Sequence, residues 1–131
     1  MIGSIITSIP GSSAYFLGGV ITYSNDSKEK LLKVKKSTMI EHGAVSENTA
    51  VEMAAGAKDL FGSDISVSTT GIAGPGGGSA AKPVGLVWIG VSTKNGTFAR
   101  KFNFDGSRND VQIKATDAAV RMLIDALAEL D

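Results

Sequence analysis

Residues 86–104 read LVWIGVSTKNGTFARKFNF, and this stretch decides the fold class of the chain. Leu86–Ser92 is strongly apolar, as expected of a buried strand, and Thr97–Phe104 is suited to be its partner. Asn95-Gly96 between them is typical of the type I′ turn, whose twist matches that of two antiparallel strands. The sequence therefore predicts an antiparallel β-hairpin here.

A glycine-rich stretch, Thr69–Gly85, leads into this hairpin and reads TTGIAGPGGGSAAKPVG. Glycine has no Cβ penalty at positive φ, so backbone N–H groups in such a loop can converge on an anion or lie flat against a ligand. Pro75 and Pro83 each fix one φ and restrain the residue before them. Neither the P-loop pattern nor the dinucleotide-binding glycine spacing is present. We interpret the stretch as a binding loop, because long connections without structure of their own are uncommon unless functional or disordered.

The elements on either side follow from hydrophobic spacing and capping residues. Asp64–Thr69 alternates apolar and polar residues, which predicts a short strand that feeds the glycine loop. A helix is predicted from a cap at Ser46 to a stop at Gly62. After the hairpin, a long amphipathic helix is predicted, capped by Ser107 or Asn109.

The first part of the chain combines helical and extended patterns. Isoleucines at helical spacing over residues 2–9 predict the back half of a helix. Ala14–Tyr23 has the aromatic and β-branched content of a strand. A short helix through Leu32, capped by Ser24 or Asn25, is predicted to follow it.

Beyond that helix, Lys33, Lys35 and Lys36 are interpreted as a solvated face, and His42 as a turn residue rather than a ligand or a base. The whole order of strands and helices, with one antiparallel hairpin, predicts a single α/β domain. Its expected architecture is an α/β/α sandwich with a mixed β-sheet that includes the hairpin.

The amino-acid composition argues against several kinds of binding partner and site. The chain has 131 residues, 13 basic and 13 acidic side chains, no cysteine and one histidine, which describes one soluble domain. Balanced charge gives no reason to expect nucleic acid or a membrane as a partner. A disulfide framework, a thiol nucleophile and a metal site are not expected. No apolar run reaches the roughly 20 residues of a bilayer span, and the start lacks signal-peptide character, so a cytoplasmic location is expected.

Four side chains are candidates for chemistry on residue type and position alone. Lys28 is suited to be a base or a phosphate contact, although helix lysines are more often solvated. Tyr23 could relay a proton or simply pack. Thr70 could act as a nucleophile or bond its own turn, and Arg108 at a helix start suits a phosphate or carboxylate or stays solvated.

Several motifs together resemble one known family, the CinA C-terminal domain or nicotinamide-nucleotide amidase (NMN deamidase) family. The resemblance runs in order along nearly the whole chain. It is carried by PGSSAYF at residues 10–16, VITYSN at 20–25 with Lys28, HGAVS at 42–46, TGIAGP at 70–75 with KPVG at 82–85, and GSR at 106–108.

The resemblance implies a compact α/β/α fold, a homo-oligomer and no cofactor. It implies hydrolysis of the carboxamide of nicotinamide mononucleotide to nicotinic acid mononucleotide and ammonia. In the family, a serine in a Glu-Ser-Cys-Thr-Gly-Gly motif attacks the amide, and a lysine and a tyrosine transfer protons. Lys28 and Tyr23 match those two positions, so they are the expected catalytic residues.

The family's Thr-Gly-Ile-Ala-Gly-Pro loop lies against the substrate, so Thr70, Gly71 and Gly74 inherit a substrate-binding role. Arg108 becomes a candidate phosphate contact. The arrangement is chemically coherent, because a lysine can activate a hydroxyl while backbone and hydroxyl donors stabilise the oxyanion and a cation binds the phosphate.

The serine motif is the departure from the family pattern, since nothing in this sequence replaces it. Family members carry it ahead of the position that corresponds to Met1. We therefore expect residues 1–131 to form one CinA C-terminal-like domain that lacks the family's first strand and the start of its first helix, with impaired catalysis. Two alternatives stay open: a non-catalytic nucleotide-binding module and an oligomer-forming structural module.

Overall fold

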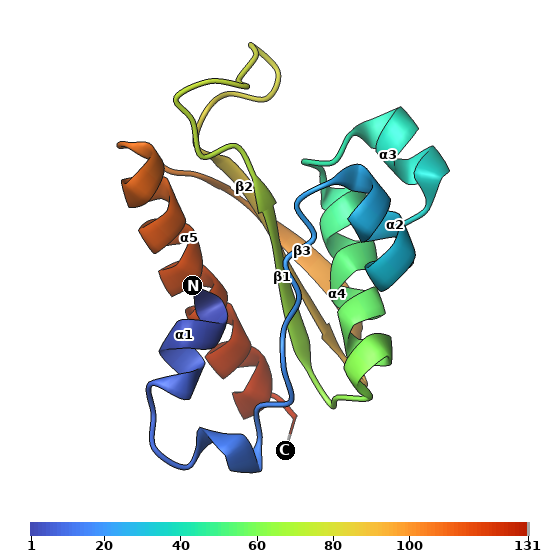
Figure 1. Cartoon of the computed structure of the whole chain (residues 1–131), viewed down its shortest axis with the longest axis vertical. Coiled ribbons are helices and arrows are strands. Elements are labelled where there is room, and N and C mark those ends of the chain that lie inside the picture. The colour runs from blue at the N-terminus through green and yellow to red at the C-terminus, as the bar shows by residue number, and fades with distance from the viewer. Residues whose placement is uncertain (131) are drawn as a thin grey trace.

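The computed structural model describes residues 1–130 and arranges them as helices on both sides of a small sheet (Figure 1). In chain order the elements are α1 (Ile2–Thr7), a 3₁₀ turn (Ser12–Ala14), α2 (Asn25–Leu32), α3 (Lys36–His42), α4 (Glu47–Phe61), β1 (Ser66–Gly71), β2 (Leu86–Thr93), β3 (Gly96–Asn103) and α5 (Arg108–Ala128).

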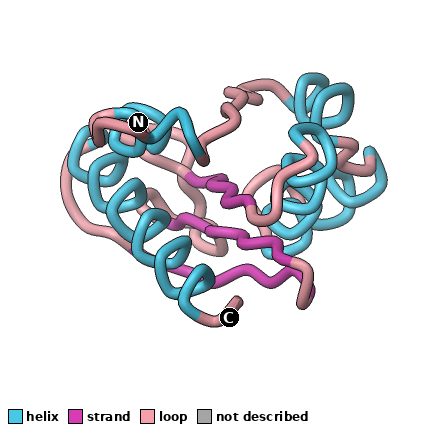
Figure 2. The backbone as a smooth tube through the Cα atoms, turned by 90° about the horizontal axis from the view of Figure 1, so that it is seen from below, coloured by secondary structure: helices cyan, strands magenta, loops and turns pink. Residues whose placement is uncertain are grey.

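The sheet has the order β1-β2-β3, and both pairings are antiparallel. Seen along the layers in Figure 2, the strands lie between two groups of helices. α5, with α1 beside it, covers one face, and α4 covers the other, with α2 and α3 packed against α4 (Figure 1). The predicted α/β/α sandwich is therefore confirmed. Among residues 1–130, no helix is long and apolar enough to cross a lipid bilayer.

The hairpin is confirmed, but its turn differs from the prediction. Thr93 pairs with Gly96, so the two loop residues are Lys94 and Asn95 rather than Asn95 and Gly96. Only Gly96 takes a positive φ here, at 129°. A type I′ turn needs positive φ at both central residues, so the prediction of this turn type is wrong.

The predicted strand Ala14–Tyr23 is wrong as well. This segment begins with the 3₁₀ turn and then runs extended beside β1 (Figure 1), without a ladder of backbone hydrogen bonds. β-branched and aromatic residues favour a strand only where a neighbouring strand pairs with them. The expected mixed sheet is also wrong for the described residues, because all paired strands are antiparallel.

The larger core lies between the sheet and α5. In β2, Val87, Ile89 and Val91 point to this side and are buried, as the two-residue period of a strand requires. They pack against α5 residues spaced three, four and eight apart, which form one helical face. These residues are Val111, Ala119, Met122 and Ala126.

The opposite face of β1 meets α4 through hydroxyl groups. Ser66 Oγ donates to the carbonyl of Ala54 at 2.5 Å, and Ser68 Oγ donates to the carbonyl of Ala50 at 2.7 Å. An ideal Cβ on Gly90 of β2 would lie 2.5 Å from the same Ala50 carbonyl oxygen. Small residues on both elements therefore bring helix and strand close enough for side-chain hydroxyls to bond the helix backbone.

The helix starts follow the predicted capping chemistry. Ser24, Ser46 and Ser107 each accept a hydrogen bond from a backbone N–H in the first turn of α2, α4 and α5. α3 was not predicted, because Lys35 at its N-cap makes no side-chain cap. His42 is its last residue, so the interpretation of His42 as a turn residue is wrong.

Gly56 generates a prediction about the packing of α2 on α4. An ideal Cβ at Gly56 would overlap the carbonyl oxygen of Leu32 at the end of α2. Gly56→Ala should therefore lower the free energy of unfolding by about 1–3 kcal/mol, although alanine is the better helix former. Gly3→Ala in α1 is the control, since its Cβ would meet only Phe16 at 3.7 Å. Urea unfolding measures both, and a Gly56→Ala variant as stable as the parent would contradict the packing.

Candidate functional site

The elements that carry the predicted site residues lie near one end of the sheet (Figure 1). β1 ends there at Gly71 and continues into the glycine loop, which projects beyond the sheet in Figure 1. α2 and α3 lie near the same end on one side, and α5 starts there on the other. Thr70 lies at the end of β1 where the loop starts, and Arg108 of α5 bonds Gly74 within the loop, whereas Lys28 belongs to α2 and bonds the carbonyls of residues 22 and 23.

The glycine loop is fastened by side chains from both sides. Arg108 donates from a guanidinium N–H to the carbonyl of Gly74 at 2.8 Å, across 34 residues of sequence. Lys82 Nζ donates to the carbonyl of His42 at the end of α3. Backbone bonds close its base, with the Gly85 N–H donating to the Ile72 carbonyl at 2.7 Å. The loop is therefore an ordered, tethered structure.

Gly71 and Gly74 are required by local crowding. A Cβ on Gly71 would lie 2.8 Å from the carbonyl oxygen of Leu86. Gly74 has φ of 87°, and its Cβ would lie 2.5 Å from Val84 Cγ1 on the returning limb of the loop. Their role in binding substrate stays a prediction, while their role in shaping the loop follows from these contacts.

Thr70 ties the end of β1 to the turn before α4. Its Oγ1 donates to the carbonyl of Ala44 at 2.7 Å, and the side chain is buried. A hydroxyl that donates to a carbonyl still has lone pairs to accept one more hydrogen bond. The structure therefore uses Thr70 to position the turn, and its contact with a substrate stays a prediction.

Lys28 is a buried amine held by two backbone carbonyls. Its Nζ donates to the Thr22 carbonyl at 2.7 Å and lies 3.5 Å from the Tyr23 carbonyl oxygen. None of the ion pairs among residues 1–130 includes it. Burial lowers the pKa of the Lys28 amine below its ordinary value of 10.5, because desolvation penalises the charged form. Such an amine loses its proton more readily than a solvated lysine.

Tyr23 adjoins Lys28 in the chain, but its phenol is not held there. The Tyr23 side chain is 86% exposed, and it is the Tyr23 carbonyl oxygen, not the phenol, that accepts from Lys28 Nζ. Its assignment to proton transfer stays a prediction, which requires the phenol to turn toward the amine when a ligand is present.

Arg108 lies at the start of α5, next to a capping box. Ser107 and Asp110 bond each other's backbone N–H groups there. Hydrogen bonds from Ser107 hold the pKa of the Asp110 carboxyl below its ordinary value of 3.8, so it is ionised at neutral pH. A carboxylate at this helix start opposes a bound anion. Any phosphate contact therefore depends on the guanidinium of Arg108 rather than on the helix N-terminus.

Sequence reasoning missed the groups that hold these residues in place. Lys82 was noted only as part of a motif, and the carbonyls of Thr22, His42 and Ala44 carry no sequence signal because every residue has one. Glu52 was missed too. Its carboxylate accepts from the Lys35 N–H at 2.8 Å and the Thr38 hydroxyl at 2.6 Å, which caps α3 from another helix.

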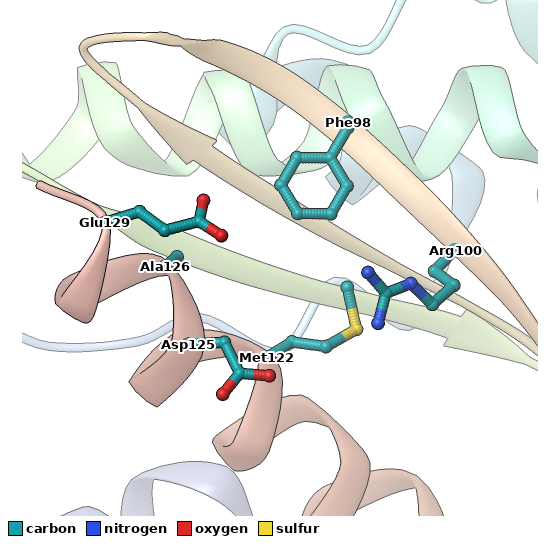
Figure 3. Close-up of a pocket in the computed structure, with 6 residues that line it drawn as sticks. All are labelled: Phe98, Arg100, Met122, Asp125, Ala126 and Glu129. Carbon is teal, nitrogen blue, oxygen red and sulfur yellow. The ribbon is translucent and has the colours of Figure 1, made fainter.

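A hollow of about 230 Å³ lies elsewhere, between β3 and α5. Figure 3 shows its lining of Phe98, Arg100, Met122, Asp125, Ala126 and Glu129. None of the predicted site residues lines it or the second hollow near Lys58 and Asp64. Within the described part of the chain, no cluster of three or more His, Cys, Asp or Glu side chains could hold a metal ion.

Comparison with known proteins shows which family the chain belongs to. The sequence pattern of the CinA C-terminal domain matches residues 1–127. The chain belongs to the CinA C-terminal domain family. It is 52% identical to a CinA-like protein of Endomicrobium trichonymphae over 93% of its own length and 28% of that protein. It is 48% identical to a CinA-like protein of Chlorobaculum tepidum, over 100% of its length and 32% of that protein.

Solved structures agree with the fold of this CinA C-terminal domain. The competence/damage inducible protein CihA of Agrobacterium tumefaciens superimposes with a TM-score of 0.91 at 42% identity, over 94% of this chain and 76% of that one. The competence damage-inducible protein A (ComA) of Klebsiella pneumoniae superimposes with a TM-score of 0.93 at 32% identity, over 99% and 81%. The chain thus spans about a third or less of the curated relatives and most of the solved domains.

The buried amine of Lys28 makes stability depend on pH. Its pKa is lower in the folded state than the ordinary 10.5 of the unfolded chain. Between these two values the unfolded state binds more protons, so folding is favoured as the pH rises. The difference in unfolding free energy between the parent and Lys28→Met should therefore shift in favour of the parent as the pH is raised from neutral toward 10.5. Urea titrations of both proteins measure the difference, and a difference constant with pH would be inconsistent with the lowered pKa.

Gly74 and Gly76 provide a matched pair within the glycine loop. Gly74→Ala should displace Val84 and weaken the contact with Arg108, because the position has positive φ and no room for Cβ. Gly76→Ala should change little, because a Cβ there meets nothing within 4 Å. Amide hydrogen exchange should be several-fold faster over residues 72–85 in Gly74→Ala only. Equal exchange in the two variants would count against the packed loop.

Proposed function

We propose that this domain binds nicotinamide mononucleotide and supplies the proton-transfer and substrate-binding part of a nicotinamide-nucleotide amidase. The reaction converts the carboxamide of the nucleotide to a carboxylate and releases ammonia. The observation that carries the proposal is the buried Lys28 amine, which two backbone carbonyls hold and whose pKa desolvation lowers. Membership of the CinA C-terminal domain family supports the same reaction class.

Lys28 suits the role of general base. An unprotonated amine can accept the proton of a hydroxyl nucleophile and later deliver it to the leaving ammonia. Desolvation increases the unprotonated fraction near neutral pH, and no carboxylate ion pair among the described residues opposes it. The two carbonyls that hold Nζ fix its position without adding charge.

The glycine loop and Arg108 suit recognition of the nucleotide. Gly71 and Gly74 keep the backbone free of side chains where a flat ring could lie against it. One guanidinium N–H of Arg108 is bonded to the Gly74 carbonyl, which leaves further donors for a phosphate. Phosphate binding by Arg108 would thus be coupled directly to the position of the loop.

The nucleophile is the part of the reaction that these 131 residues do not supply. A Glu-Ser-Cys-Thr-Gly-Gly motif is absent, since the sequence has no cysteine. In the described residues, Lys28 Nζ bonds carbonyls and no hydroxyl, while Ser66 and Ser68 are bonded to α4. Loss of a nucleophile costs several powers of ten in rate even where binding persists. The second candidate, a non-catalytic nucleotide-binding module, is favoured by this same observation.

The test compares two proteins: the 131-residue chain and a longer version that adds the family's serine motif ahead of residue 1. Calorimetry measures binding of nicotinamide mononucleotide, and an ammonia assay measures hydrolysis. We expect both proteins to bind the nucleotide and only the longer one to release ammonia rapidly. Lys28→Met and Tyr23→Phe in the longer protein should reduce ammonia release by at least about a hundredfold, and Arg108→Ala should mainly weaken binding.

The outcomes separate the candidates. Binding by both proteins without ammonia release from either would favour the nucleotide-binding module. Turnover that neither Lys28→Met nor Tyr23→Phe reduces would remove the proposed catalytic roles. Absence of binding in both proteins would leave the oligomer-forming module as the better description.

A further inference from the structure

The end of α3 is attached to three different parts of the chain. Three consecutive backbone carbonyls, those of residues 42–44, each accept a hydrogen bond from a side chain of another element. Thr70 Oγ1 of β1 donates to the carbonyl of residue 44 at 2.7 Å, and Thr49 Oγ1 of α4 donates to that of residue 43 at 2.8 Å. Lys82 Nζ of the glycine loop donates to that of residue 42. β1 and α4 are held in the sandwich by their own packing, so Lys82 is the attachment that can be released while the core stays folded.

The outer part of the glycine loop depends on the same contact. Residues 75–81 are exposed, whereas Lys82 is partly buried. Among residues 1–130, the hydrogen bond from Lys82 to His42 is the one that joins residues 75–82 to another element. Within the loop, the Ser79 N–H donates to the Lys82 carbonyl at 2.8 Å, and the Lys82 N–H donates to Ser79 Oγ at 3.1 Å. This limb is thus a closed turn, which release of the ammonium would free as a unit.

Gly43 leaves the space that the Lys82 ammonium occupies. It has a positive φ of 85°, and an ideal Cβ there would lie 2.6 Å from Lys82 Nζ. A side chain at position 43 would therefore displace the ammonium from the carbonyl of His42. The ammonium is also favoured electrostatically, because the last carbonyls of a helix have no partner within it and carry partial negative charge.

α3 in turn depends on contacts from outside itself. It has seven residues, fewer than an isolated helix needs for stability in water. Lys35 at its N-cap makes no side-chain cap, and the carboxylate of Glu52 from α4 bonds that end instead. Lys82 supplies the matching contact at the other end. The end of α3 and the outer part of the loop are therefore expected to open together.

We propose that Lys82 is a latch, which holds the glycine loop closed against the end of α3 and thereby positions the loop for its ligand. Lys82 is a positioning residue in this proposal, because it acts through the loop rather than on the ligand. The link to a ligand rests on the proposed function, whereas the latch itself rests on contacts within the chain. If the ligand binds only the closed loop, its apparent affinity falls in proportion to the closed fraction.

The first experiment is residue-resolved amide hydrogen exchange of the 131-residue chain and of Lys82→Met. The Gly43 N–H, which bonds the Met39 carbonyl, and the Ser79 N–H should both exchange at least about fivefold faster in the variant. Lys94→Met is the matched control, since Lys94 is exposed in the turn at the opposite end of β2 from the loop. Circular dichroism checks that both variants fold. An unchanged rate at either amide, or equal acceleration by Lys94→Met, would overturn the latch.

The second experiment asks whether Gly43 acts through Lys82. Gly43→Ala should accelerate exchange of the Ser79 amide about as much as Lys82→Met does, because its Cβ displaces the ammonium. In the Lys82→Met background the same substitution should add less than about twofold, since backbone strain at position 43 is then its only effect. Equal effects in the two backgrounds would overturn the proposal.

The third experiment uses nicotinamide mononucleotide as the ligand. Lys82→Met should raise its dissociation constant about tenfold, and Lys94→Met should leave it unchanged. In the longer protein with the serine motif, Lys82→Met should raise KM while kcat stays within about twofold. A fall in kcat with unchanged KM would overturn the positioning role. If the parent does not bind the nucleotide, the proposed function fails, and the two exchange experiments still decide whether Lys82 is a latch.

Discussion

Three hydroxyl-to-carbonyl hydrogen bonds fix β1 against α4 and the turn before it, and the rest of the structure depends on them. Ser66 and Ser68 lie two residues apart on the strand, and their acceptors Ala54 and Ala50 lie one turn apart on the helix. Two strand residues rise about 6.6 Å and four helical residues about 6 Å, so the two spacings match. A purely apolar contact would allow the helix to slide along the sheet. These bonds allow one register only.

The register between β1 and α4 also determines where the glycine loop starts. Thr70 continues the series by bonding Ala44, which brings the end of α3 beside the strand end where the glycine loop starts. Lys82 then fastens the loop to the carbonyl of His42, and Arg108 fastens its far side to α5. The loop is therefore positioned by two helical layers at once. A displacement of either layer would change the position of the loop.

Signals local in sequence predicted the structure well, and signals that depend on distant partners did not. Caps at Ser46 and Ser107, the stop at Gly62 and the hairpin were visible because each involves a few consecutive residues. Ala14–Tyr23 has strand composition, but its conformation depends on whether a neighbour pairs with it. Lys28, Thr70 and Arg108 were recognised as candidates from residue type, position and the family motifs. The tether of Arg108 to Gly74 was not, since its acceptor is a backbone carbonyl 34 residues away.

The extended run of residues 17–23 beside β1 affects how susceptible the chain is to proteolysis. Its N–H groups donate to no other backbone group in the structure, and Ile21 and Tyr23 are 90% and 86% exposed. Proteases bind their substrates as extended chains with free backbone groups and accessible side chains. Residues 17–21 have an extended form without prior unfolding, whereas the carbonyls of Thr22 and Tyr23 accept from Lys28 Nζ. Cleavage within this run would separate α1 from the rest of the sandwich, and a partner that covered the run would protect the chain from cleavage there.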